Sequence, residues 1–338
     1  MKSYDVYGIG NALLDMEYEV EDEFLTQMNI PKGVMTLVSN ERQNDIIQAM
    51  GQKSIRNITS GGSVANSMVA LQYFGGKGFF SCKVASDKAG EHYHAEMRSM
   101  GLDSNFDHSP KSQGETGRCL VKITPDSDRT MNTYLGVSVT LSESELHWEA
   151  LAQAKFLYLE GYLLSSPSAL AAVKKAKNFA HDRGTKVALS LSDPFMVNAF
   201  KEAFLEILSP KIEMLFANRE EALAFAGTSK FEEALERLKQ VSRCFAVTLG
   251  ARGSLVFDGQ VLHEIPAAPA KPIDTLGAGD MYAGAFLYGL TQGYSFLDAA
   301  ALANVTSAYV VTQYGPRISK EVVPMLLQQA QLKVSEEC

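Results

Sequence analysis

The segment between residues 156 and 249 decides the fold, because it contains four short apolar runs: Phe156-Leu157-Tyr158-Leu159, Val187-Ala188-Leu189-Ser190-Leu191, Met214-Leu215-Phe216-Ala217 and Phe245-Ala246-Val247-Thr248-Leu249. Stretches with helical spacing of apolar residues lie between or beside the runs, over about 168–181, 199–208, 220–225 and 231–239. Short apolar strands that alternate with such helices are typical of a parallel sheet covered on both faces. Right-handed crossovers place the carboxyl ends of these strands at one edge, where ligands of open α/β sheets bind. Asp193, Asn218 and Thr248 are therefore expected at that edge.

The first half of the chain has a mixed pattern. Residues 6–10 and 79–84 are predicted as strands, and residues 63–73 as a helix. Two further segments, 13–40 and 113–137, are strand-like, and the second contains a hairpin turn at 125–128. We expect both segments to form a small β lid on a single domain that comprises residues 1–338.

Composition and charge limit the class of protein. The chain has 338 residues, of which 46% are hydrophobic and 21% charged, as in globular proteins. Its net charge of −8 gives no sign of a basic nucleic-acid surface. No apolar run approaches the roughly 20 residues that span a bilayer, and no signal peptide precedes the first strand. Four scattered cysteines, Cys82, Cys119, Cys244 and Cys338, fit reduced thiols in a cytoplasmic enzyme that acts on small molecules, with no nucleic-acid or membrane partner.

The chemistry is concentrated in the string Asp274-Thr275-Leu276-Gly277-Ala278-Gly279-Asp280, which precedes an apolar helix of small residues. Free N–H groups and the positive end of the helix dipole form an anion site at such a helix start. Gly277, Ala278 and Gly279 allow an anion to approach the backbone closely. Asp280 would repel a phosphate, but it fits a base that takes the proton of a hydroxyl attacking phosphorus. The alternative is that Asp280 only caps the helix.

This string resembles the signature of the ribokinase-like (PfkB) family of carbohydrate and nucleoside kinases, and the resemblance runs in order along nearly the whole chain. The other matching motifs are Gly10-Asn11 with Asp15, Ser60-Gly61-Gly62-Ser63-Val64-Ala65-Asn66, Asn218-Arg219-Glu220-Glu221 and Thr248-Leu249-Gly250-Ala251-Arg252-Gly253. The resemblance implies an α/β fold, namely a three-layer α/β/α sandwich with a mostly parallel central sheet and a β lid over the sugar. Leu276 replaces the polar residue that is commoner at its position.

The resemblance also implies a role for each motif. Asp280 would be the base, and Gly277, Ala278 and Gly279 would form the anion hole. Asn218 and Glu221 would organise Mg²⁺ near the phosphates of ATP, with Glu221 acting through water. Three residues would line the ATP site: Thr248, Gly250 and Asn304.

Two further residues are candidates for cation chemistry. Arg129, at the end of the predicted lid turn, is the candidate cation for the γ-phosphate of ATP. Asp274 is a candidate contributor to a monovalent-cation site.

The acceptor alcohol is predicted from polar residues near the first strand. Asn11 and Asp15 would bind the sugar hydroxyls, and Asn66 would add a hydrogen bond. Gly61 and Gly62 would let the sugar approach the backbone. Apolar candidates for the walls of a base pocket are Met35, Tyr134, Leu135, Tyr162 and Phe195, and together they favour a nucleoside over a free sugar.

Within the family the chain most resembles the adenosine kinase branch, which implies that ATP and adenosine give ADP and AMP. Inosine or guanosine, or a sugar such as ribose or fructose, remain open as acceptors. A monomer and a homodimer both remain open.

Two other classes of protein remain as rivals. Gly8-Ile9-Gly10 is similar to a dinucleotide-binding turn, but Leu13 stands where that motif has its third glycine, and the sequence contains no P-loop motif. A non-catalytic ligand-binding protein of the same fold is the second rival. The presence of Asp280 favours an enzyme.

Overall fold

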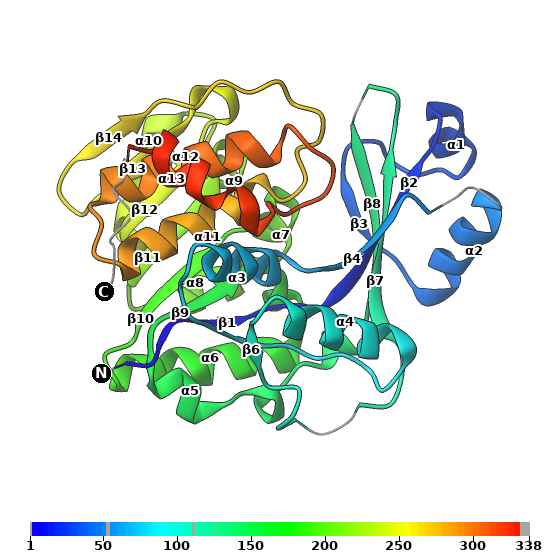
Figure 1. Ribbon diagram of the computed structural model, residues 1–338, viewed down its shortest axis with the longest axis horizontal. Helices are drawn as coiled ribbons and strands as arrows, with labels where there is room; N and C mark the ends of the chain where they lie inside the picture. The colour runs from blue at the N-terminus through cyan, green and yellow to red at the C-terminus, as the bar shows by residue number, and fades with distance from the viewer. Residues whose placement is uncertain (1, 52–54, 110–111, 127, 332–338) are drawn as a thin grey trace.

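The computed structural model describes residues 2–51, 55–109, 112–126 and 128–331, and it contains a nine-stranded and a five-stranded sheet (Figure 1). The order of the larger sheet is β14 (Leu262–Ile265), β13 (Ser254–Phe257), β12 (Ser242–Thr248), β11 (Ile212–Asn218), β10 (Lys186–Ser190), β9 (Ala154–Glu160), β1 (Tyr4–Ile9), β5 (Gly78–Ser81) and β6 (Asp103–Ser104). Neighbouring strands from β12 to β6 are parallel, and only β13 and β14 add antiparallel pairs. The predicted mostly parallel central sheet is confirmed.

Successive residues of the central strands pack into opposite helical layers. Phe216 of β11 belongs to one apolar core, whereas its neighbour Leu215 belongs to the other. Burial of each such side chain contributes roughly 1.5–3 kcal/mol, which explains why the strands are apolar on both faces. The first layer contains α3 (Ser63–Tyr73), α4 (Lys88–Ser99), α11 (Ala278–Thr291), α12 (Phe296–Val310) and α13 (Val323–Gln329). The second contains α5 (Trp148–Ala152), α6 (Pro167–Asp182), α7 (Pro194–Ala199), α8 (Lys201–Ile207), α9 (Arg219–Ala226) and α10 (Phe231–Val241). The three-layer α/β/α sandwich is therefore confirmed.

The smaller sheet stands beside the sandwich, at the right of Figure 1. Its strand order is β3 (Met35–Leu37), β8 (Arg129–Gly136), β7 (Thr116–Ile123), β2 (Leu13–Glu19) and β4 (Asn57–Gly61). Four of these strands come from segments 13–40 and 113–137, but β4 lies outside both. The sequence analysis missed β4 because Ile58 is its only large apolar residue.

Two helices cover the outer face of the smaller sheet, α1 (Asp22–Gln27) and α2 (Asn40–Met50). Phe24 and Ile46 from these helices pack with Tyr18 and Leu120 from the strands. The outer face is therefore closed by the chain itself, and the inner face is left for the site described below.

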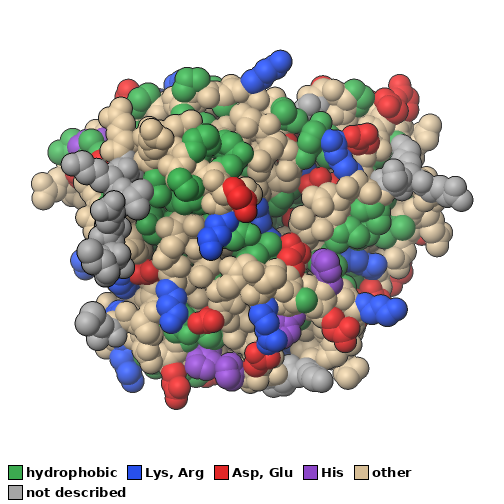
Figure 2. All heavy atoms as spheres, viewed as in Figure 1, with side chains coloured by type: hydrophobic (Ala, Val, Ile, Leu, Met, Phe, Trp, Pro, Cys, Tyr) green, Lys and Arg blue, Asp and Glu red, His purple; other side chains and the backbone are tan. Residues whose placement is uncertain are grey.

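Within the described part of the chain, no helix is long and apolar enough to cross a membrane. Acidic and basic side chains are interspersed on the face shown in Figure 2, and they do not gather by sign. Cys82, Cys119 and Cys244 are buried free thiols, and Cys338 lies outside the described residues.

Candidate active site

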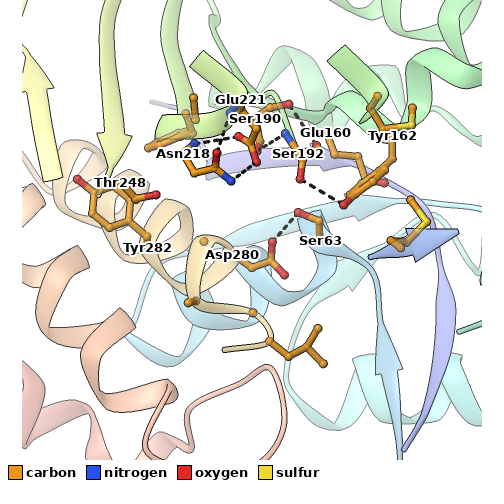
Figure 3. Close-up of a pocket in the computed structure, with 18 of the residues that line it drawn as sticks. Ser63, Glu160, Tyr162, Ser190, Ser192, Asn218, Glu221, Thr248, Asp280 and Tyr282 are labelled. Atoms are coloured by element: carbon orange, nitrogen blue, oxygen red, sulfur yellow. Dashed lines mark hydrogen bonds between the residues drawn. The ribbon is translucent and has the colours of Figure 1, made fainter. Parts of the chain in front are cut away.

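A cavity of about 980 Å³ lies between the inner face of the smaller sheet and the carboxyl edge of the larger one (Figure 3). The smaller sheet, which is the predicted lid, supplies apolar side chains that include Met35, Val121, Met131 and Leu135. Thirteen of the predicted site residues line it: Asn11, Asp15, Gly62, Asn66, Tyr162, Asn218, Glu221, Thr248, Gly250, Gly277, Ala278, Gly279 and Asp280. The tertiary structure thus brings together motifs that are spread over most of the chain.

The glycine turn at the start of α11 contains two glycines with different constraints. Gly277 is the N-cap and has a left-handed backbone (φ 75°), and a Cβ there would lie 2.2 Å from the carbonyl oxygen of Pro316. Gly279 is exposed to the cavity, and a Cβ on it would meet no atom within 4 Å. The fold itself requires Gly277, whereas only something bound in the cavity would require Gly279.

Asp280 is held by the first turn of α3. The hydroxyl of Ser63 donates to its Oδ1 at 2.6 Å (Figure 3). Nδ2 of Asn66 donates to Oδ2 of Asp280 at 2.8 Å. Burial raises the pKa of Asp280 to about 6, although both hydrogen bonds and the charge of Arg317 oppose this shift. Asp280 is therefore mostly ionised at neutral pH, and carboxylates that accept two hydrogen bonds retain lone pairs for a third.

A second carboxylate, that of Asp15 on β2, lines the end of the cavity where the acceptor is predicted to bind. The register partner of Asp15 on β4 is Thr59, and Gly61 lies two residues further along the same strand; a Cβ at Gly61 would lie 2.0 Å from Asp15 Oδ2. Gly61 therefore makes room for Asp15 and is not itself a described lining residue. Burial raises the pKa of Asp15 to about 7.

Glu160, at the end of β9, is a site residue that the sequence analysis missed. Its Oε1 accepts from the backbone N–H and Nδ2 of Asn11 at 2.9 and 2.8 Å, and its Oε2 accepts from the N–H of Val64 at 2.9 Å. Burial raises its pKa to about 7. Glu160 thus orients Asn11, which is predicted to bind the sugar, and holds the start of α3. The signal in the sequence that could have identified Glu160 is its position directly after an apolar run.

Ser63 and Ser192 were also missed. Ser192 has a left-handed backbone (φ 73°), and its carbonyl accepts from the hydroxyl of Tyr162 at 3.2 Å. Their partners lie in distant segments, so no local pattern marks either serine.

Asn218 and Glu221 form a reciprocal cap at the start of α9. The backbone N–H and Nδ2 of Asn218 donate to the Glu221 carboxylate at 2.9 and 2.7 Å, and Oδ1 of Asn218 accepts from the N–H of Glu221 at 2.8 Å. Burial raises the pKa of Glu221 to about 8. Among the described residues no group of three His, Cys, Asp or Glu could hold a metal ion. These donors fit a hydrated Mg²⁺ held through water better than a direct cage of side chains.

Three predicted site residues lie outside the described lining of the cavity, in addition to Gly61. Phe195, in the first turn of α7, is 61% exposed. Asn304 is buried and its Nδ2 donates to the carbonyls of Ile265 and Pro266, so it anchors the segment after β14.

Arg129, the third, is buried in an ion pair with the carboxylate of Asp274, and its Nη1 lies 3.8 Å from Oε1 of Glu17. Long-range pairing of this kind leaves no trace in local sequence. Of the candidate base-pocket walls, Tyr134 is also absent from the described lining, because it alternates with Leu135 along β8.

The comparisons with known proteins agree with this geometry. The model of the pfkB family of carbohydrate kinases matches residues 36–322. The adenosine kinase of Saccharomyces cerevisiae is 27% identical over 336 residues, which cover 93% of this chain and 97% of that protein.

Two solved structures extend the comparison. The adenosine kinase from Sinorhizobium meliloti has 36% identity and a TM-score of 0.90, with 97% of this chain and 99% of that chain covered. A probable sugar kinase from Rhizobium etli has 34% identity and a TM-score of 0.92, with 98% and 100% covered. The chain belongs to the pfkB family of carbohydrate kinases and is an ATP-dependent kinase, as its motifs implied.

Proposed function

We propose that this kinase transfers the γ-phosphoryl group of ATP to the 5′-hydroxyl of a nucleoside, with adenosine as the preferred acceptor. The observation that carries the proposal is the position of Asp280, which lies at the start of α11 in a cavity with an apolar lid face. The two adenosine kinases described above support the choice of acceptor.

In the proposed reaction, the acceptor oxygen attacks the γ-phosphorus and the bond to the leaving ADP breaks. The hydroxyl proton passes to the carboxylate of Asp280. The resemblance implied an anion hole of Gly277, Ala278 and Gly279. Because the N–H of Ala278 donates to the carbonyl of Thr275 at 3.4 Å, we assign the developing phosphoryl charge instead to the N–H groups of Gly279 and Asp280, in the first turn of α11 where the helix supplies no acceptor.

Asn11 and Asp15 bind the ribose hydroxyls in this proposal, with Gly62 allowing the sugar to approach. Tyr162 and the apolar lid residues Met35, Val121, Met131 and Leu135 pack against the base. A free sugar would leave this apolar surface in contact with water, which favours a nucleoside.

Magnesium is expected from the charge of the cavity. Of the residues that line it, six are Asp or Glu and two are Arg. Mg²⁺ would neutralise part of the triphosphate charge, and Asn218 and Glu221 would hold it through water.

Arg129 takes a different role in this proposal from the one expected from its sequence position. Its guanidinium pairs with Asp274, so we assign it to the contact between lid strand β8 and the segment before α11. The same guanidinium supplies the positive charge beside Asp274, and we therefore propose no monovalent-cation requirement. A cytoplasmic location and a monomeric or dimeric state stay predictions.

An ADP-release assay tests the proposal with adenosine, inosine, guanosine, ribose and fructose, each with Mg²⁺ present or chelated. We expect the highest kcat/KM with adenosine and loss of turnover when Mg²⁺ is chelated. Equal or better turnover of ribose or fructose would contradict the nucleoside assignment, and a preference for inosine or guanosine would correct the base. ADP release at full rate without any acceptor would contradict phosphoryl transfer to an alcohol.

A further inference from the structure

We propose that Arg317 is a positioning residue for catalysis: it locks the amide of Asn66 in the orientation that donates a hydrogen bond to Asp280. This inference rests on the proposed function, because it assumes that Asp280 accepts the proton. Arg317 is not a described lining residue of the cavity, so it would act only through Asn66 and through its charge.

Arg317 reaches the site from the loop between α12 and α13. Its Nε donates to Oδ1 of Asn66 at 2.8 Å, and its guanidinium also donates to the backbone carbonyl of Ser60. Its Nη1 lies 3.6 Å from Oε1 of Glu96, and its side chain is 8% exposed. These contacts fix a long side chain in one position.

The direction of the Asn66 amide follows from donor chemistry. A guanidinium can only donate, so the amide oxygen of Asn66 must face Arg317. The amide nitrogen must then face Asp280, where it lies 2.8 Å from Oδ2. This donor favours the ionised carboxylate, which is the form that a base requires. Without Arg317 the amide could rotate by half a turn and present its oxygen to Asp280, which would favour the protonated acid.

Charge acts in the same direction as this hydrogen bond. Asp280 faces titratable groups on several elements: Asp15 on β2, Tyr158 and Glu160 on β9, Tyr162 after β9, and Glu221 on α9. The charge of Arg317 lowers the pKa of Asp280, and together with that of Arg129 it lowers the pKa of Asp15. It therefore offsets part of the burial that raises both values.

The same arginine also fixes the entry from the lid into α3. Ser60 lies just before the Gly61-Gly62 pair, and Oε2 of Glu96 accepts hydrogen bonds from the N–H and the hydroxyl of Ser60 at 2.9 and 2.6 Å. Arg317 and Glu96 thus hold the end of β4 beside the helix that carries Asn66. Arg317 therefore contacts both strand β4 and the first turn of α3, which holds Asp280.

The test compares Arg317→Gln and Arg317→Lys with the matched control Arg98→Gln, which removes an exposed arginine of α4 that pairs with Asp107. We expect Arg317→Gln to lower kcat by up to about 100-fold, because the base loses its fixed orientation. The acidic limb of the kcat profile should move upward by about one pH unit, because an opposite charge beside the carboxyl is lost. Arg317→Lys should keep the limb near that of the parent enzyme, and Arg98→Gln should change neither quantity.

A double-mutant cycle separates this role from a general loss of structure. In an Asn66→Ala background, Arg317→Gln should lower kcat much less than in the parent, because the residue through which it acts is gone. Thermal melting identifies variants that no longer fold. If Arg317→Gln is one of them, the test uses Arg317→Lys in its place. An unmoved acidic limb in folded Arg317→Gln, or full additivity in the cycle, would overturn the inference. Failure of the parent enzyme to release ADP in response to an acceptor would instead overturn the proposed function.

Discussion

The two ends of the cavity are built in different ways. At the phosphate end, the parts are local: Gly277 to Asp280 are consecutive, and Asn218 caps the helix that contains Glu221. At the acceptor end, each group depends on a distant partner, as Asn11 does on Glu160 and Asp280 on Ser63. An ATP-dependent kinase binds the phosphates of ATP whatever its acceptor is, so a contiguous motif is enough to bind them. The acceptor requires an arrangement that only packing between separate elements provides.

Asp280, the proposed base, belongs to both ends of the cavity, so its removal should have the largest effect. We expect Asp280→Asn to lower kcat by about 10²–10⁴-fold, because proton transfer is lost while the shape is retained. Affinity for ATP should remain close to that of the parent, as measured by titration calorimetry. Near-normal turnover of this variant would remove Asp280 as the base.

The two glycines of the turn distinguish function from folding at the phosphate end. Gly279→Ala meets no atom and lies in a helix, so its free energy of unfolding should stay equal or rise by up to about 1 kcal/mol. Its kcat/KM for ATP should nevertheless fall by about 10²-fold or more, because a methyl group would stand where the phosphoryl group binds.

Gly277→Ala is the comparison variant, and it should lower the melting temperature because of the clash with Pro316. A fully active Gly279→Ala enzyme would show that the phosphate does not approach this turn.

Asp15 tests whether the acceptor end is separable from the phosphate end. We expect Asp15→Ala to raise KM for adenosine by about 10- to 100-fold, because a charged hydrogen bond to the sugar is lost. KM for ATP should change far less, which steady-state kinetics with each substrate varied would show. Equal effects on both constants would place Asp15 outside the sugar site.

The smallest expected effect concerns stability and pH. Burial raises the pKa of Asp15 and Glu160 to about 7, of Glu221 to about 8 and of Asp280 to about 6. In unfolded chains such groups titrate near 4, so the folded protein binds more protons between about pH 4 and 8, and its stability falls as pH rises through this range.

We therefore expect the melting temperature of the free enzyme to decline from pH 5 to pH 8 in calorimetry at constant ionic strength. Asp280→Asn should make this decline shallower, since it removes one of the four groups. A melting temperature that rises with pH over this range would show that these carboxyl groups are not buried as described.

Most of the fold could be predicted because its central strands are buried on both faces and therefore apolar throughout. Strand β4 could not, because Ile58 is its only large apolar residue. The helix expected over 199–208 begins at Lys201, since Phe200 leaves the helical conformation and separates α7 from α8.

Most predicted site residues line the cavity, because the motifs that carry them are local. Phe195, Asn304 and Arg129 illustrate the limit of that reasoning. Residue type and position suggested a base wall for Phe195 and a phosphate cation for Arg129, and the family resemblance implied an ATP contact for Asn304. In the structure the ring of Phe195 is exposed, and the guanidinium of Arg129 pairs with Asp274. The side-chain amide of Asn304 donates to two backbone carbonyls.

The amino-acid sequence alone determined the layered α/β architecture, the lid hairpin and the glycine turn before α11, since each follows from neighbours within one segment. Only the tertiary structure decided which groups hold Asp280 and in which direction the amide of Asn66 points. The physical reason is that these contacts join α3 to α11 and to the loop before α13, which both lie more than 200 residues further along the chain and meet α3 only when the apolar layers pack.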